Sequence, residues 1–303
     1  MTQPPRFSQI AAIFAVFTIL GIALVLAQPS LTPPAGPIDE TARFGVLIEL
    51  NDTTAPPDAL YEHVITQPGS YYLTADVIGG PGGPLQGEGG GVLILVDDVT
   101  LDLNGFALRG TGLSSIGVSV ANADGADTET ERITVRNGRI VGFAVGVRGV
   151  SFGTNEQGAQ IASRLSGLHL DGLHVDAQST GIDVSGARVI NCAITSPRTG
   201  IRAFFSIVEG CEIRMRGEPI LNLATGMTVQ QSNITRCHVD TTGSDASTRN
   251  GFIGVDSLFT ACTARDGANG FNLVGTSIAN GCLAINVTGN SVSATSQTND
   301  SNF

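Results

Sequence analysis

The chain has 303 residues, of which 42% are hydrophobic and 14% charged, and its formal net charge is −11 at pH 7. This balance excludes a disordered chain and a helical bundle, which are both richer in charged residues. All 16 basic residues are arginine, since the sequence contains no lysine. The acidic excess argues against nucleic acid and anionic membrane surfaces as partners, because both are bound through a basic face.

Residues 1–27 have the pattern of an export signal. Arg6 is the only charged side chain before an apolar run at 10–27, and Ala27 ends a small-residue cleavage site. The run also reaches the length of a minimal membrane span, about 17 residues. We therefore expect either a cleaved signal peptide or a retained N-terminal anchor, followed by a stiff Pro-rich linker at 28–40. Both alternatives place the folded part outside the cytoplasm, either secreted, periplasmic or at the cell surface, with no membrane contact beyond the anchor.

The five cysteines lie in a sequence repeat. They occupy the second position of "NCAI", "GCEI", "RCHV", "ACTA" and "GCLA", which begin 19, 26, 25 and 20 residues apart. A period of this length, with β-branched strands, Gly and Asn turns and no helical pattern, predicts a β-solenoid. Its successive coils pair about 4.8 Å apart, so that equivalent side chains stack in columns. The inward column predicted from this repeat contains Cys192, Cys211, Cys237, Cys262 and Cys282.

The spacing of this column predicts free thiols. Stacked residues keep their Cβ atoms near the strand spacing, which is wider than the Cβ separation of about 3.8 Å that a disulfide prefers. The cysteines are therefore expected to pack as small hydrophobic residues. A straight column offers no tetrahedral set of ligands, so we predict neither a metal site nor a cofactor.

The N-terminal half follows the same pattern with longer coils. Two strands with alternating apolar residues flank an Asn-Gly turn in both "VTLDLNGFALRG" (99–110) and "ITVRNGRIVGF" (133–143). Asn104, Asn137 and Asn191 are predicted to stack at this turn as an asparagine ladder, bonding backbone groups that the bend leaves unpaired.

We expect a single β-helix at 41–292, followed by a polar tail at 293–303 that frays. Residues 41–78 show no clear repeat and are predicted to cap the open end of the solenoid. Three polar loops interrupt the repeat, at 79–91, 121–131 and 151–160.

A resemblance to a known family lies in three stretches: "ITQPGSYYLTADVIG", "VLILVDDVTLDLNGFALRG" and "ITVRNGRIVGFAVGV". They resemble the secreted bacterial β-helix proteins of the pectate-lyase-like superfamily, and the resemblance covers residues 65–290. It implies an all-β fold, the right-handed parallel β-helix. It implies no single activity, because the same solenoid serves lyases, hydrolases, epimerases, phage spikes and adhesins.

One segment, "STGIDVSGARVINCAI", resembles the first motif coil of polygalacturonases. That family carries Asn-Thr-Asp before the glycine and an Asp-Asp pair on the next coil, whereas this chain has Gln178, Ser179 and Thr180, then "SPRTGIRA". An inverting hydrolase needs one carboxyl group as acid and a second to activate water. Because these positions lack both, we predict no catalytic residue.

The repeat places Arg148, Asp183 and Arg202 in one outward column, followed by Leu221, Ile253 and Asn272. Arginine can bind a carboxylate through two hydrogen bonds, so Asp183 between two arginines is a candidate ligand-binding site. The alternative is an ion ladder on the surface, which supports neighbouring strands modestly. We favour the ladder, since one acid is too few for the six or more oxygen ligands of Ca²⁺.

A second outward face carries the densest polar cluster. Glu212 is predicted beside His238, and Arg214, Asp240 and Arg265 are predicted in the next column. A Glu–His pair could transfer a proton, but a flat sheet face offers no cleft that excludes water. Surface pairing is the favoured interpretation.

We therefore expect an exported β-helix module without a catalytic role, which binds a glycan or an envelope polymer or serves a structural role. The alternative is a divergent polysaccharide lyase or glycoside hydrolase built on Arg148, Asp183 and Arg202. Carbohydrate binding has one point against it, because the chain has no tryptophan and only three tyrosines, all near its N-terminal end: Tyr61, Tyr71 and Tyr72.

Overall fold

The computed structural model describes residues 47–50, 60–80, 89–111, 115–121, 131–149, 151–154, 160–163, 167–216, 224–242, 249–288 and 297–299. The chain divides into two units, 1–43 and 44–303, and every described residue belongs to the second. The predicted export segment and linker lie outside the described residues, as does most of the predicted loops at 79–91 and 121–131. Within the described ranges no helix is long and apolar enough to cross a membrane.

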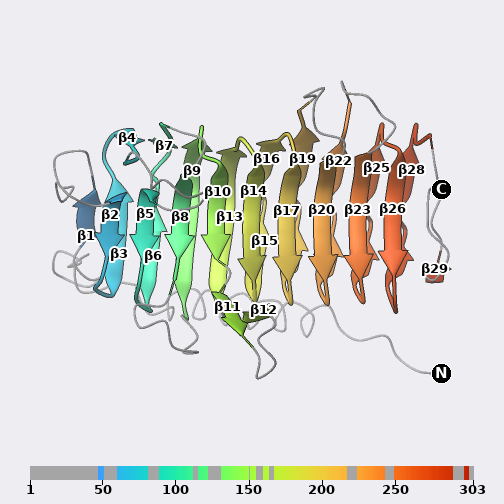
Figure 1. Cartoon of the computed structure of the whole chain (residues 1–303), viewed down its shortest axis with the longest axis horizontal. Helices are drawn as coiled ribbons and strands as arrows, with labels where there is room; N and C mark the ends of the chain where they lie inside the picture. Colours follow the sequence, from blue (N-terminus) through green and yellow to red (C-terminus); the bar gives the residue numbers. More distant parts are fainter. Residues whose placement is uncertain are drawn as a thin grey trace, which may run out of the picture. The chain divides into compact units, whose positions relative to one another are not determined.

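One face of the second unit is a parallel sheet of nine strands (Figure 1). Its order follows the chain: β2 (Tyr61–Ile65), β5 (Gly90–Ile94), β8 (Ile116–Val120), β10 (Val145–Gly149), β14 (Thr180–Ser185), β17 (Thr199–Phe204), β20 (Ala224–Gln230), β23 (Arg249–Val255) and β26 (Asn269–Val274). We call it the nine-stranded sheet.

The remaining parallel strands form a second sheet with two rows, of which two long strands, β9 (Ile133–Val141) and β13 (Leu168–Asp176), belong to both. The first row also contains β1 (Leu47–Leu50), β3 (Gly69–Leu73), β6 (Val99–Asp102), β15 (Ala187–Ile190), β18 (Ile207–Glu209), β21 (Asn233–Thr235), β24 (Leu258–Thr260), β27 (Ile278–Asn280) and β29 (Gln297–Asn299). The second row also contains β4 (Val77–Ile78), β7 (Ala107–Arg109), β16 (Ala193–Ser196), β19 (Glu212–Met215), β22 (His238–Asp240), β25 (Thr263–Arg265) and β28 (Leu283–Ile285).

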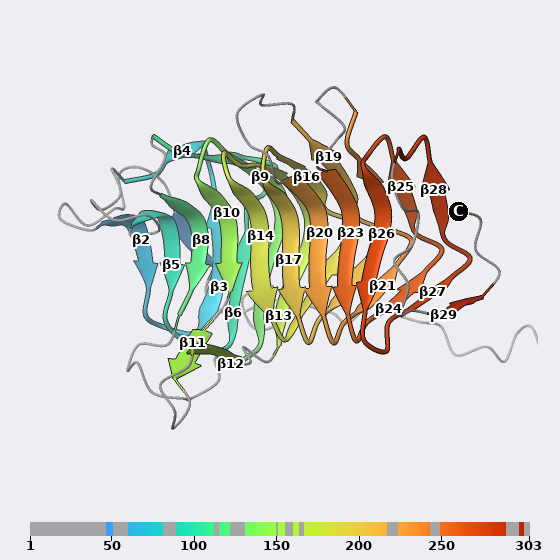
Figure 2. The same ribbon diagram turned by 45° about the vertical axis from the view of Figure 1, so that its right-hand side comes forward.

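The chain therefore visits the nine-stranded sheet, the first row and the second row in turn, and each strand pairs with its equivalents one coil before and after. Strands β17, β18 and β19 make one such coil, and β20, β21 and β22 make the next. Figure 2 shows the first-row strands β21, β24 and β27 side by side. The predicted right-handed parallel β-helix is confirmed.

Sharp corners join the rows, and each depends on a residue in the left-handed region. At the first corner, between the nine-stranded sheet and the first row, φ is 51° at Phe205, 48° at Gln231 and 50° at Asp256. At the second corner, between the two rows, Ala261 has φ 52°. Such a backbone conformation turns the chain within one residue and directs the side chain of the corner residue outward.

The three asparagines of the predicted ladder all lie at the second corner with positive φ: Asn104, Asn137 and Asn191. Gly172 occupies the same corner of the coil between Asn137 and Asn191, so the column is interrupted there. Nδ2 of Asn104 donates to the carbonyl oxygen of Leu73 at 3.2 Å, as predicted. Nδ2 of Asn137 donates instead to the Asp102 carboxylate at 3.1 Å, because a charged acceptor lies within reach.

The five cysteines lie in the apolar interior as free thiols, none more than 2% exposed. Each donates its S–H to the carbonyl oxygen two residues earlier, at 3.2 Å for Cys192 and 3.4 Å for Cys237. Nearby, the rings of Phe252 and Phe271 stack with centroids 4.8 Å apart, which is the spacing between coils. The core is thus a set of columns of like side chains.

Three boundaries differ from the sequence prediction. Residues 61–78 do not form a cap without repeats, since β2, β3 and β4 make a regular coil paired with β5, β6 and β7. The predicted loop at 151–160 contains an antiparallel hairpin of β11 (Ser151–Thr154) and β12 (Gln160–Ser163). The predicted frayed tail contains β29, which pairs with β27. In each case strand pairing was hidden by a sequence without the cysteine repeat.

Candidate functional site

The column of Arg148, Asp183 and Arg202 is assembled by strands β10, β14 and β17, which place the three residues opposite one another. Nε of Arg202 donates to Oδ1 of Asp183 at 2.8 Å, and Nη2 donates to Oδ2. The hydrogen bond to Asp183 raises the pKa of Arg202 above its ordinary value, against a smaller lowering effect of burial. Arg148 has no ion pair among the described residues, because both carboxylate oxygens face Arg202.

The prediction of a surface ladder is wrong for Asp183. Asp183 lies between core-facing residues of β14, so its side chain points away from the interior. That side chain is nevertheless only 2% exposed. Ser119 and Ser185, at outward positions of the same sheet, are also buried, so the outer face is covered around β14. The column continues to Thr228 of β20 rather than to Leu221, because the long segment after β19 shifts the register.

The second polar cluster has the predicted register but other partners. Glu212 lies opposite His238, and Arg214 opposite Asp240, which lies opposite Arg265. The described ion pairs join Glu212 to Arg214 along one strand at 3.6 Å, and Arg265 to its neighbour Asp266 at 3.0 Å.

Asp240 of that cluster accepts the backbone N–H of Thr242 at 2.8 Å and a short bond from its hydroxyl. Burial raises the pKa of Asp240, but the two bonds from Thr242 and the charges of His238 and Arg265 outweigh it, so that the net shift is downward. An acid held ionised in this way is a poor proton donor at neutral pH.

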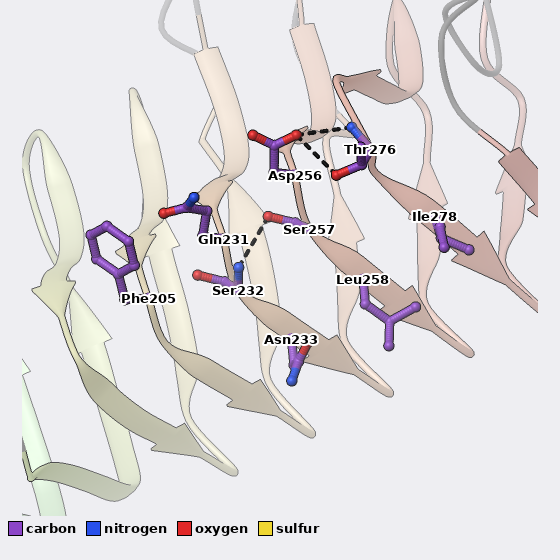
Figure 3. A pocket seen from close by; sticks show the side chains of 9 residues that line it. All are labelled: Phe205, Gln231, Ser232, Asn233, Asp256, Ser257, Leu258, Thr276 and Ile278. Carbon is purple, nitrogen blue, oxygen red and sulfur yellow. Dashed lines mark hydrogen bonds between the residues drawn. The ribbon is translucent and has the colours of Figure 1, made fainter.

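A groove of about 490 Å³ crosses the first corner of the C-terminal coils (Figure 3). Its lining residues come from successive coils: Phe205, Gln231, Ser232, Asn233, Asp256, Ser257, Leu258, Thr276 and Ile278. Phe205, Gln231 and Asp256 stand at the corner because their left-handed backbone directs them outward. Asn233, Leu258 and Ile278 begin strands β21, β24 and β27 and face outward along one wall.

A column of buried serines fixes the floor of this groove. The hydroxyl of Ser232 donates to the carbonyl oxygen of Gln230 at 2.8 Å and accepts the N–H of Ser206 at 3.0 Å. Ser257 repeats both bonds one coil later, accepting the N–H of Ser232 at 3.2 Å. Because each serine links its own coil to the next, the corner side chains above it are held at a fixed spacing.

The groove has a mixed chemistry. Oδ1 of Asp256 accepts the N–H of Thr276 at 2.9 Å and its hydroxyl at 3.1 Å, which leaves Oδ2 for another donor. The exposed amides of Gln231 and Asn233 can both donate and accept hydrogen bonds. Leu258 and Ile278 add apolar surface, and none of the described lining residues is an arginine. The site therefore suits an uncharged ligand with hydroxyl groups and apolar faces.

The sequence contained a signal for this corner that the cysteine alignment did not use. A serine stands five residues before each of the last four cysteines, at Ser206, Ser232, Ser257 and Ser277. The residue before each of the first three serines is the corner residue with positive φ, whereas before Ser277 the positive φ falls one residue earlier, at Gly275; the residue after each serine begins a first-row strand. No metal-binding group of three or more His, Cys, Asp or Glu side chains is found in the part of the chain that the structure describes.

Comparison with known proteins identifies the fold and nothing finer. No protein-family model matches the chain, and no curated protein matches it. The solved structure of ORF18 from Geobacillus virus E2 is similar at a TM-score of 0.50 and 10% identity; the match covers 98% of this chain, which spans 65% of the viral protein. The A-module of a mannuronan C-5 epimerase from Azotobacter vinelandii matches at a TM-score of 0.30 and 12% identity, over 77% of this chain and 89% of that one. At these identities the likeness extends to the parallel β-helix only.

Proposed function

We propose that the protein is an extracytoplasmic binding module for an uncharged polysaccharide, which lies along the groove at the first corner. The observation that carries this proposal is the lining of the groove, where amide and carboxylate groups lie beside accessible apolar side chains on successive coils. The extracytoplasmic location rests on the sequence of residues 1–27.

The lining matches the two surfaces of a sugar ring. The C–H face of a pyranose is apolar and packs on aliphatic or aromatic side chains, here Leu258, Ile278 and Phe205. The hydroxyl rim needs donors and acceptors, which the side chains of Gln231, Asn233 and Asp256 supply. An acidic sugar is disfavoured, because Asp256 and the net charge of −11 would repel it.

A polymer fits this site better than a single sugar. The groove is open and crosses several coils, so that one ligand unit can contact only a few of its lining residues. Several weak contacts on one chain add through effective concentration. We therefore expect affinity to rise with chain length.

A second candidate function, catalysis on a polysaccharide, rests on the burial of Asp183. A buried carboxylate beside two arginines is typical of a site that has a task beyond surface pairing. Against it, both carboxylate oxygens bind Arg202, and a hydrolase needs a second carboxyl group.

The test is a binding screen over neutral and acidic polysaccharides with analysis of any products. We expect binding to a neutral polymer, weakened at least about tenfold by Gln231→Ala. Ala261 already occupies a left-handed corner with φ 52°, so alanine is tolerated at such a position. The matched control is Gln230→Ala, an exposed amide one residue earlier that does not line the groove. Equal loss in both variants, or binding confined to acidic polymers, would refute the groove as the site.

A further inference from the structure

A second cavity, of about 380 Å³, lies on the first row near the N-terminal end of the β-helix. Its lining includes Ser70, Tyr72, Thr100, Asp102, Asn104 and Arg136. None of these residues lines the groove at the first corner. The volume falls within the usual range for small-ligand sites, about 300–1,000 Å³.

Strand register builds the site from three successive coils. Tyr72 of β3 lies opposite Asp102 of β6, which lies opposite Arg136 of β9. Tyr72 faces outward because its neighbours Tyr71 and Leu73 are buried in the core. An aromatic ring, a carboxylate and a guanidinium are thus aligned at the coil spacing of about 4.8 Å.

The carboxylate of this cavity is held in place by three donors. Oδ2 of Asp102 accepts Nε of Arg136 at 2.9 Å, and Oδ1 accepts the backbone N–H of Asn104 at 2.8 Å and Nδ2 of Asn137 at 3.1 Å. Its side chain is 23% exposed and that of Arg136 is 51% exposed. The pair is therefore rigid and accessible, which reduces the ordering cost of binding a ligand.

An ion ladder alone does not account for this arrangement. Arg109 with Asp76, and Arg132 with Asp98, form similar pairs across neighbouring coils of the same region. Those pairs lie beside neither of the two cavities, whereas Asp102 and Arg136 share one with an outward tyrosine. Charge pairing stabilises all three ladders, but only this one offers a flat apolar surface next to fixed polar groups.

We infer that this cavity is a second binding site, for one uncharged pyranose unit. The Tyr72 ring packs on the C–H face of the sugar, as amphipathic aromatic side chains do at wet interfaces. The Asp102 carboxylate accepts a hydrogen bond from one sugar hydroxyl. The Nη groups of Arg136, which have no described partner, donate to the adjacent sugar hydroxyl. The fixed charges sum to zero, so the site has no preference for an acidic sugar. The inference shares no residue with the proposed function and stands without it.

The absence of tryptophan makes tyrosine emission a direct probe, because only Tyr61, Tyr71 and Tyr72 contribute. We would titrate the full chain with cellobiose and maltose as uncharged probes and with digalacturonate as the acidic probe. The expected result is a saturable change in emission with an uncharged disaccharide, at an affinity no lower than that for digalacturonate. No saturable change with either uncharged probe, or tighter binding of digalacturonate, overturns the inference.

Two variants assign the signal. Tyr72→Phe keeps the ring, so calorimetric affinity should stay within about threefold while the emission change is strongly reduced. Arg136→Gln removes the guanidinium and should weaken binding at least about tenfold with the melting transition retained. Tyr71 also lines the cavity, so a small residual change is compatible with the site, but an emission change of undiminished size in Tyr72→Phe contradicts packing of the ligand on the Tyr72 ring. Gln231→Ala, in the groove, should leave the titration unchanged, so that failure of one site is told apart from failure of the other.

Discussion

Arg202 binds the carboxylate of Asp183 from the neighbouring coil, with Nε 2.8 Å from Oδ1, and covers an acid whose side chain is 2% exposed. The arginine itself is 43% exposed. The ion pair thus joins a buried carboxylate to a guanidinium that is partly exposed to solvent. This asymmetry decides what happens when the acid is changed.

Asp183→Asn should lower the free energy of unfolding by about 1.5–3 kcal/mol, the range for hydrogen bonds to charged groups. The loss is limited because the freed Arg202 can turn into solvent. Urea denaturation measures it, with Asp76→Asn as the control. Asp76 also receives two bonds from its arginine, both at Oδ2, but the side chains of Asp76 and Arg109 are at least 42% exposed, so the loss should stay below about 1 kcal/mol.

The same Asp183→Asn protein separates binding from catalysis. If the protein is a binding module, the variant should bind polysaccharide as the native chain does. A polymer-degrading activity in the native protein that disappears in this variant, with the fold retained, would instead support the lyase or hydrolase alternative.

The cysteine column predicts the reactivity of the thiols. Denatured protein should titrate five thiols and native protein almost none, since all five are buried. The hydrogen bond with Cys237 and burial raise the pKa of Cys262. Cys211→Ser should cost about 1–3 kcal/mol by placing a hydroxyl in an apolar column. An unchanged melting temperature, or any disulfide in the native protein, would contradict the column.

The fold and the cysteine column could be predicted because they repeat residue types at fixed offsets. The groove could not, because its corner positions hold Phe205, Gln231 and Asp256, which share a backbone conformation rather than a chemistry. The cavity beside Tyr72 was missed because its coils are longer than those of the cysteine repeat. Tyr72 and Asp102 lie 30 residues apart, and Asp102 and Arg136 lie 34 residues apart. The burial of Asp183 depends on what covers a sheet face, which no local pattern records.

The glycine of the repeated "TGI" segment is required by the spacing of the coils. A Cβ atom on Gly200 would lie 2.5 Å from the carbonyl oxygen of Gly226 and 2.3 Å from Cγ2 of Ile213. Since the oxygen belongs to the strand ladder, Gly200→Ala should destabilise the protein by about 3 kcal/mol or more.

Gly172→Asn is the matched control for Gly200→Ala. A Cβ on Gly172 meets no atom within 4 Å, and its φ of 61° is close to that of Asn137 at the same corner. Asparagine tolerates this conformation, so thermal unfolding should change little or shift upward. A large loss of stability in Gly172→Asn would mean that the corner has no room for the completed asparagine ladder.

Acid should weaken the pair of Asp76 and Arg109. The backbone N–H of Ala107 and the Arg109 guanidinium hold the pKa of Asp76 below its ordinary value of 3.8. A carboxyl whose pKa is lowered by folding contributes stability above its unfolded pKa and loses it as the pH falls through the folded value. The difference in urea midpoint between native protein and Asp76→Asn should therefore be constant from pH 7 to about pH 5 and shrink below about pH 4. A difference that grows on acidification would reverse the sign and refute the pairing.

Ser232→Ala tests the floor of the groove. The change removes the acceptor of the Ser206 N–H and the donor to the Gln230 carbonyl oxygen, and it leaves both backbone groups buried. We expect a loss of about 1–3 kcal/mol in unfolding free energy, the cost of unsatisfied buried groups. Amide hydrogen exchange gives the specific readout, because the Ser206 amide should exchange faster while amides of the second row keep their protection. Asn233→Ala, one residue later and exposed, should change stability by less than about 0.5 kcal/mol. If the Ser206 amide kept its protection in Ser232→Ala, the serine column would not be what holds the corner.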